Sequence, residues 1–153
     1  MAWTGARHTA LHATIVDLAR EVWRASAVVV DATGVGAGLA SFLAASLGRR
    51  PAIPTIPFVF SAATKSALGW DLLALIDSGR LKEYADDGDA LTRLYWDQLR
   101  ATTYETLAGP GKLLRWSVPM ARGHDDLVVS MALAAILDGV DWRSRVALGS
   151  AEC

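Results

Sequence analysis

Two short acidic motifs, far apart in the sequence, hold the side chains best suited to chemistry. Asp31 directly follows the apolar run 28–30, whereas Asp125 and Asp126 follow Gly123-His124 and precede a second apolar run. Carboxylates at the ends of apolar elements are costly to keep charged unless a positive group neutralises them. A hard divalent cation such as Mg²⁺ is the usual partner, because it prefers oxygen ligands. The two motifs therefore predict a metal-dependent site that acts on a phosphodiester.

Three interpretations are open for Asp31 and the glycines that follow it. The segment fails the dinucleotide-binding fingerprint because Leu39 stands where the third glycine is required, and no P-loop Gly-Lys-Ser/Thr is present. A nucleotide-binding α/β module is therefore the weakest alternative. In a purely structural role, Asp31 would cap the next helix and the glycines would allow a tight turn. As a metal ligand, Asp31 would lie at the carboxyl end of a buried strand, where open α/β sheets place their sites.

Asp125 and Asp126 also have a structural alternative. Acidic residues favour the start of a helix because the helix dipole is positive there. One aspartate would satisfy that role, yet two adjacent ones enter a helix with no polar face. The pair therefore favours function over capping.

The basic residues indicate only local contacts with nucleic acid. The formal net charge is −1, which argues against a protein that coats DNA, since non-specific affinity comes mainly from neutralised phosphates. Lys112, Arg115 and Arg122 lie on the approach to the second acidic motif and form a candidate DNA-binding patch, or simply a solvated face. Lys65 is expected to hold a DNA phosphate or to pair with a site carboxylate. His124 is expected to orient a carboxylate, contact phosphate, or act as an ordinary loop residue.

Length and composition indicate one globular domain. The chain has 153 residues, 52% of them hydrophobic, which is enough to form a substantial core. We expect the domain to cover 1–140 and a tail to cover 141–153. No apolar run is long enough to span a membrane and no signal peptide is evident; these features predict a soluble, cytoplasmic protein. The lone Cys153 gives neither a disulfide nor a metal site.

Apolar periodicity predicts alternating helices and strands. Such alternation is typical of an α/β domain with a sheet flanked by helices. We expect helices over 9–23, 39–47, 64–78, 91–99 and 125–137, buried strands over 27–30 and 56–60, a short extended piece over 80–84, and a β-hairpin formed by 102–107 and 112–118.

Several segments together resemble the C-terminal nuclease domain of the large terminase subunit of tailed bacteriophages. These segments occur in order over most of the chain: VVVDATGVG (28–36), PFVFS (57–61), TKS (64–66), LLALIDSGRL (72–81) and GHDDLVVSMALA (123–134). The resemblance implies a ribonuclease H-like mixed sheet flanked by helices. It also implies an endonuclease that cuts viral DNA during packaging.

By this resemblance, Asp31 matches the family's second acidic metal ligand, and Asp125 with Asp126 matches its third acidic motif. The implied cofactors are two Mg²⁺ or Mn²⁺ ions, roughly 3.5–4 Å apart, with one ion activating water and the other stabilising the leaving 3′ oxygen. The implied partners are double-stranded DNA, the phage portal and the small terminase subunit. The expected location is the cytoplasm of the bacterial host.

The chain departs from the family at its beginning, since the strands that open the sheet and carry the first metal-binding aspartate have no counterpart before the first predicted helix. Two hypotheses follow. The chain is an endonuclease whose missing ligand comes from elsewhere, or it is an incomplete domain or prophage remnant that retains only DNA or partner binding. An uncovered sheet edge would in addition favour a homodimer.

Overall fold

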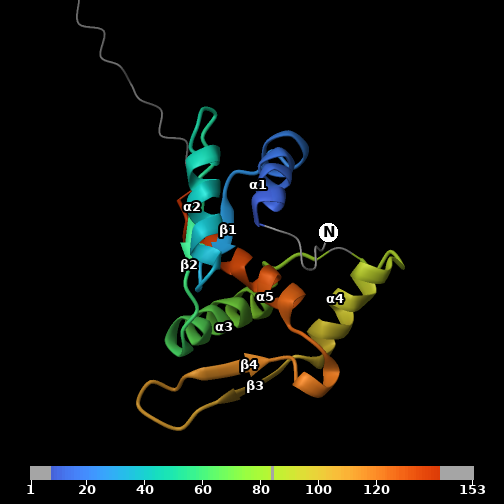
Figure 1. Cartoon of the computed structure of the whole chain (residues 1–153). Coiled ribbons are helices and arrows are strands. Elements are labelled where there is room, and N and C mark those ends of the chain that lie inside the picture. The colour runs from blue at the N-terminus through green and yellow to red at the C-terminus, as the bar shows by residue number, and fades with distance from the viewer. Residues whose placement is uncertain (1–7, 84, 142–153) are drawn as a thin grey trace, which may run out of the picture.

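The computed structural model describes residues 8–83 and 85–141, and it contains both helices and strands (Figure 1). In chain order the elements are α1 (His8–Asp17), a π-helical turn (Leu18–Val22), β1 (Val28–Asp31), α2 (Gly36–Leu47), β2 (Thr55–Phe58), α3 (Ala62–Asp77), α4 (Ala90–Ala101), β3 (Thr103–Thr106), β4 (Leu114–Ser117), a 3₁₀ turn (Met120–Arg122), α5 (Asp126–Leu133) and a 3₁₀ helix (Ala134–Gly139). The chain is therefore an α/β protein, as the sequence predicts.

Strands β1 and β2 form a short parallel sheet. They are joined through α2, and their register runs from Val28 opposite Thr55 to Asp31 opposite Phe58. Parallel pairing requires a crossover of this kind, because the chain must return to the same end of the sheet. The register brings Asp31 to the carboxyl end of the sheet.

The predicted β-hairpin is confirmed. β3 and β4 pair antiparallel, with Tyr104 opposite Trp116 and Glu105 opposite Arg115. Along β4 the side chains alternate: Leu114 and Trp116 are buried, whereas Arg115 is exposed. This period of two is typical of a strand with one face on the core. The buried face of β4 packs against α3, which lies beside it in Figure 1.

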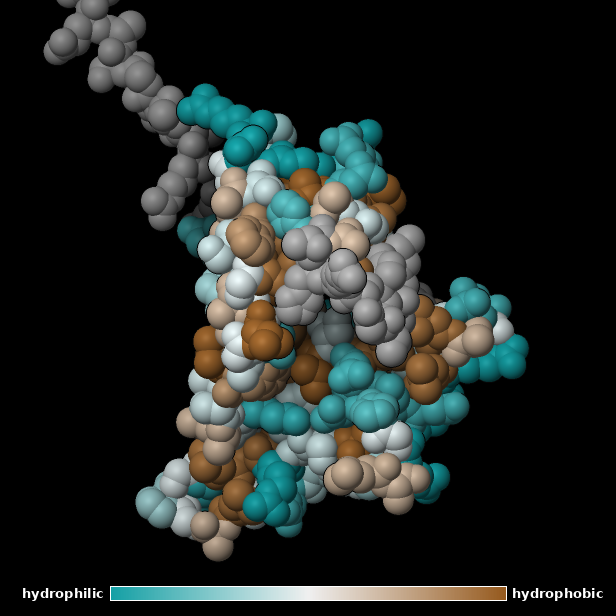
Figure 2. All heavy atoms as spheres, viewed as in Figure 1, coloured by the Kyte–Doolittle hydropathy of each residue, from teal (hydrophilic) through white to brown (hydrophobic). Residues whose placement is uncertain are grey.

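Among the described residues, two separate apolar clusters form the core. The larger cluster joins α3, β4 and α5 around Leu68, Trp116 and Val128, and the smaller one joins α2 to the segment after α1 around Leu43 and Ala19. Large apolar side chains also reach the surface between polar areas (Figure 2). The two small cores therefore leave part of the apolar surface uncovered.

Several sequence-based expectations need correction. The expected single mixed sheet is not formed within 8–83 and 85–141, because β3 and β4 make a sheet of their own instead of extending β1 and β2. The short extended piece expected at 80–84 has no regular secondary structure over its described residues, 80–83, and pairs with no strand there, so that expectation stays a prediction. The helix expected over 9–23 changes to a π-helical turn after Asp17, and the one over 125–137 becomes 3₁₀ after Leu133.

The sheet of β1 and β2 contains no third strand among the described residues. Pairing of two copies through the free edge of β1 stays a prediction. Apart from Asp141, the expected tail over 141–153 lies outside the described residues. No helix in the described part of the chain is long and apolar enough to cross a membrane.

Candidate functional site

Asp31 is exposed at the carboxyl end of β1, and it does not cap α2. Its Oδ1 accepts a hydrogen bond of 2.8 Å from the backbone N–H of Thr33, which makes a local turn. The N-cap of α2 is Val35, and no side chain makes a capping hydrogen bond there. The capping role considered for Asp31 is therefore wrong. Its side chain closes the turn with one oxygen and leaves Oδ2 for other partners.

Two glycines after Asp31 have steric reasons to be glycine. Gly34 has a φ of +56°, a conformation that side chains with a Cβ adopt at a cost. A Cβ on Gly36 would overlap the carbonyl oxygen of Asp31. The turn from strand to helix thus accounts for both residues. Gly38 has open space around it, so the turn does not account for that glycine.

The carboxylates of Asp125 and Asp126 also do not cap α5. Asp125 is the N-cap of α5 but makes no side-chain capping bond. The backbone N–H of Leu127 donates instead to Oε1 of the buried Gln98 on α4, at 3.0 Å. Asp126 is exposed in the first turn of α5, where the helix dipole favours its negative charge. Gln98 therefore accepts the hydrogen bond at the start of α5 that an aspartate was expected to accept.

The structure brings Asp31 and Asp126 to one open hollow of about 320 Å³. Neither carboxylate makes an ion pair with another described residue. The rest of the lining is largely apolar and comes from α1, β1, α2 and α5: Ile15, Val28, Val29, Val30, Leu39, Leu43, Val129, Ser130 and Leu133. Both carboxylates are exposed at the mouth of this hollow. The hollow therefore offers oxygen donors that could hold a hard cation.

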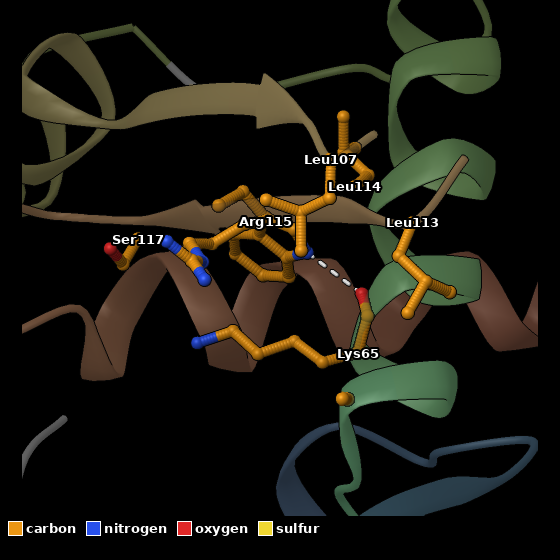
Figure 3. Close-up of a pocket in the computed structure, with 8 residues that line it drawn as sticks. Lys65, Leu107, Leu113, Leu114, Arg115 and Ser117 are labelled. Carbon is orange, nitrogen blue, oxygen red and sulfur yellow. Dashed lines mark hydrogen bonds between the residues drawn. The ribbon is translucent and has the colours of Figure 1, made fainter. Parts of the chain in front are cut away.

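Asp125 makes a different contact. Its Oδ2 lies 3.3 Å from Nζ of Lys65 on α3, and the two side chains are only 29% and 33% exposed. The Lys65 ammonium also lies 4.9 Å from the centre of the Trp116 ring. Trp116 Nε1 donates a hydrogen bond of 2.8 Å to the backbone oxygen of Lys65 (Figure 3). Of the two roles expected for Lys65, the structure therefore contains the pairing with a site carboxylate.

Two of the site carboxylates could hold a hard cation. Among residues 8–83 and 85–141, no group of three or more His, Cys, Asp or Glu side chains is arranged to hold a metal ion. Mg²⁺ commonly takes one or two carboxylates and completes its shell with water and substrate phosphate. Asp31 and Asp126 meet that requirement at the hollow. Asp125 already has a positive partner.

The basic residues divide into two groups. Lys65 and Arg115 line one pocket of about 290 Å³ between α3 and the hairpin, together with Leu107, Leu113 and Trp116 (Figure 3). Arg115 is exposed and pairs with Glu105 across the hairpin at 3.0 Å. The other candidates are exposed: Lys112 in the hairpin turn, and Arg122 and His124 just before α5.

Sequence analysis missed three residues that hold the site together. Trp116 fixes Lys65, Gln98 caps α5, and the buried Ser66 Oγ accepts a 2.8 Å bond from the N–H of Leu114. Gln98 and Ser66 share a signal that sequence analysis could have used. Each is a polar residue on the buried face of a helix, where an unpaired polar group is costly.

Comparison of the chain with models of known families, with curated proteins and with solved structures gives no match. Support for a function therefore comes from the resemblance in the motifs and from the geometry of the site.

Proposed function

We propose that this chain is a metal-dependent DNA endonuclease similar to the nuclease domain of large terminase subunits, with β1 and β2 as its part of a ribonuclease H-like sheet. One observation carries the proposal. Asp31 and Asp126 come from elements far apart in the sequence, yet both line one hollow and neither is neutralised by a described side chain. Structural roles account for these carboxylates only in part: Asp31 closes its own turn with Oδ1 alone, and Gln98 supplies the hydrogen bond to the start of α5.

In this proposal Asp31 and Asp126 hold Mg²⁺ or Mn²⁺ together with water and phosphate oxygens. The bound cation supplies Lewis-acid stabilisation of the charge that develops on the phosphate. The reaction is hydrolysis. A water oxygen bonds to phosphorus while the bond from phosphorus to the leaving strand oxygen breaks, and a water proton passes to that oxygen. One strand end then carries phosphate and the other carries hydroxyl.

The substrate in this proposal is double-stranded DNA, held by a few local contacts. Arg122 and His124 immediately precede the site aspartates in the chain, and Lys112 and Arg115 lie on the hairpin. Each phosphate neutralised by such a residue makes DNA affinity more sensitive to salt. Because these residues are few, DNA binding should weaken steeply with rising salt concentration only if several of them contact phosphate together.

The test is nicking of supercoiled plasmid in Mn²⁺, in Mg²⁺ and in EDTA. We expect metal-dependent nicking by the unchanged chain and a loss of about 100-fold or more in Asp31→Asn and Asp126→Asn, because each change removes a charged ligand. Asp77→Asn, at the exposed end of α3, is the charge-matched control and should retain full activity. Circular dichroism checks that all variants remain folded.

Nicking that survives both site variants would contradict the proposal, since a contaminant or another site would then be responsible. A folded chain that cleaves no DNA in either metal would favour the second hypothesis. In that case the domain is catalytically incomplete and its remaining role is binding to DNA or to a partner.

A further inference from the structure

The charge of Asp125 is already compensated within the chain. Lys65 Nζ lies 3.3 Å from its Oδ2, and both side chains are about two-thirds buried. Partial burial makes such a pair stronger than one on the open surface, because water screens it less. An ammonium group has three donor hydrogens, and no further described side chain accepts one from Lys65. The exposed third of Lys65 therefore retains donor capacity.

Lys65 is held in place from both ends. Its backbone oxygen accepts a hydrogen bond from Trp116 Nε1, and its ammonium lies over the Trp116 ring. Trp116 itself is only 5% exposed, and the neighbouring bond from Leu114 N–H to Ser66 Oγ ties β4 to the same turn of α3. A lysine fixed in this way loses little further side-chain entropy when it binds an anion.

The positions of the carboxylates allow one ion to be held without disturbing this pair. Asp126 lines the hollow with Asp31, whereas its neighbour Asp125 contacts Lys65. A second ion at the start of α5 would need Asp125 as a ligand and would have to displace the ammonium. The ion pair between Asp125 and Lys65 thus argues against the second ion that the motif resemblance implies.

We propose that Lys65 takes the place of a second metal ion. This inference rests on the proposed nuclease function and deepens it. One divalent cation is held by Asp31 and Asp126, and the Lys65 ammonium beside Asp125 is the second positive charge that faces the DNA phosphate. Lys65 thereby both positions Asp125 and binds phosphate with its remaining donors. Fixed positive charge of this kind stabilises the charge that develops during phosphoryl transfer.

Calorimetric titration with Mn²⁺ tests the number of ions without reference to cleavage. We expect one ion per chain, the same stoichiometry in Asp125→Asn, and loss of binding in Asp126→Asn. Two ions per chain, falling to one in Asp125→Asn, would overturn the inference and leave the proposed nuclease function intact. The absence of any Mn²⁺ binding would overturn both.

Replacing Lys65 separates its role in charge from its role in packing. Lys65→Met keeps the apolar stem and removes the ammonium, so Asp125 becomes an uncompensated charge beside Asp126. We expect Mn²⁺ to bind more tightly, on the order of tenfold, while plasmid nicking falls by about 100-fold. Lys82→Met is the control for loss of a lysine charge at an exposed position and should change neither quantity.

A purely structural lysine gives a different result. Lys65→Met would then lower the melting temperature and leave Mn²⁺ affinity unchanged, and that outcome would overturn the inference. Lys65→Arg provides the rescue, because it restores a positive charge and should return Mn²⁺ affinity toward that of the unchanged chain.

Discussion

Gly69 on α3 is the position where the packing around Lys65 is most sensitive to a single methyl group. A Cβ at this position would lie 2.5 Å from Trp116 Nε1, 2.6 Å from Trp116 Cδ1 and 2.8 Å from a methyl group of Leu114. The indole cannot yield easily because it is 5% exposed and its Nε1 donates to Lys65. Gly69→Ala must therefore displace Trp116 or separate α3 from β4.

The expected cost follows from opposing contributions. Overpacking in a core costs about 1–3 kcal/mol, and weakening the indole hydrogen bond adds about 1 kcal/mol. Alanine gains about 1 kcal/mol over glycine in a helix interior. The net expectation for Gly69→Ala is destabilisation by about 1–3 kcal/mol. For a chain of this size, 2 kcal/mol lowers the melting temperature by roughly 4–8 °C.

Gly38→Ala is the matched control. Gly38 is also helical, in α2, but nothing lies within 4 Å of the position its Cβ would take. This variant should be more stable than the unchanged chain by about 0.5–1 kcal/mol. Urea unfolding, with circular dichroism as the signal, measures the free energy of unfolding of both variants. If Gly69→Ala is as stable as Gly38→Ala, the close approach of α3 to Trp116 is refuted.

Three further predictions concern other parts of the fold. Arg20→Ala should cost about 1–3 kcal/mol in urea unfolding, because its guanidinium donates to four backbone carbonyls at and after the end of α2; Arg20→Lys should not restore this loss, since an ammonium lacks the planar fork. Gln98→Ala should leave the Leu127 N–H without its partner and so speed its hydrogen exchange; unchanged exchange would contradict the cap. The pKa of Asp87 is held below its ordinary value, chiefly by the backbone N–H of Asp89. The stability from this contact is present above about pH 4 and is lost as pH falls through the lowered pKa. A nuclear magnetic resonance titration of the Asp87 carboxyl measures that pKa.

Local patterns in the sequence were sufficient to predict much of the fold. The valines of β1 followed by Asp31 predict a strand that ends in a carboxylate, and the turn residues at 108–111 predict the hairpin that forms. Both signals are local, because strand periodicity and turn chemistry depend on neighbouring residues. The position of the hairpin in the fold depends instead on contacts between residues distant in the sequence. Leu114 and Trp116 face α3, and nothing in the spacing of β4 distinguishes a helix from another strand as its partner.

The candidate site was predictable in its residue types but not in its pairings. Asp31, Asp125 and Asp126 follow from the two motifs, whereas the sequence leaves two roles open for Lys65. Which of these roles Lys65 has depends on its contact with Asp125, which joins α3 to the start of α5. Only tertiary packing determines which distant side chains meet. The cap from Gln98 to Leu127 is missed for the same reason.

The central claim is that Asp31 and Asp126 hold a divalent cation together, and paramagnetic broadening by Mn²⁺ tests it most directly. In a proton–nitrogen correlation spectrum, substoichiometric Mn²⁺ should first broaden the amide signals of Asp31, Ala32, Asp126 and Leu127, because a paramagnetic ion acts on nearby nuclei. The acidic loop at 86–89, which also carries several carboxylates, should lose its signals only at higher concentrations. Broadening that begins in that loop, or that spreads evenly over the chain, would contradict the claim.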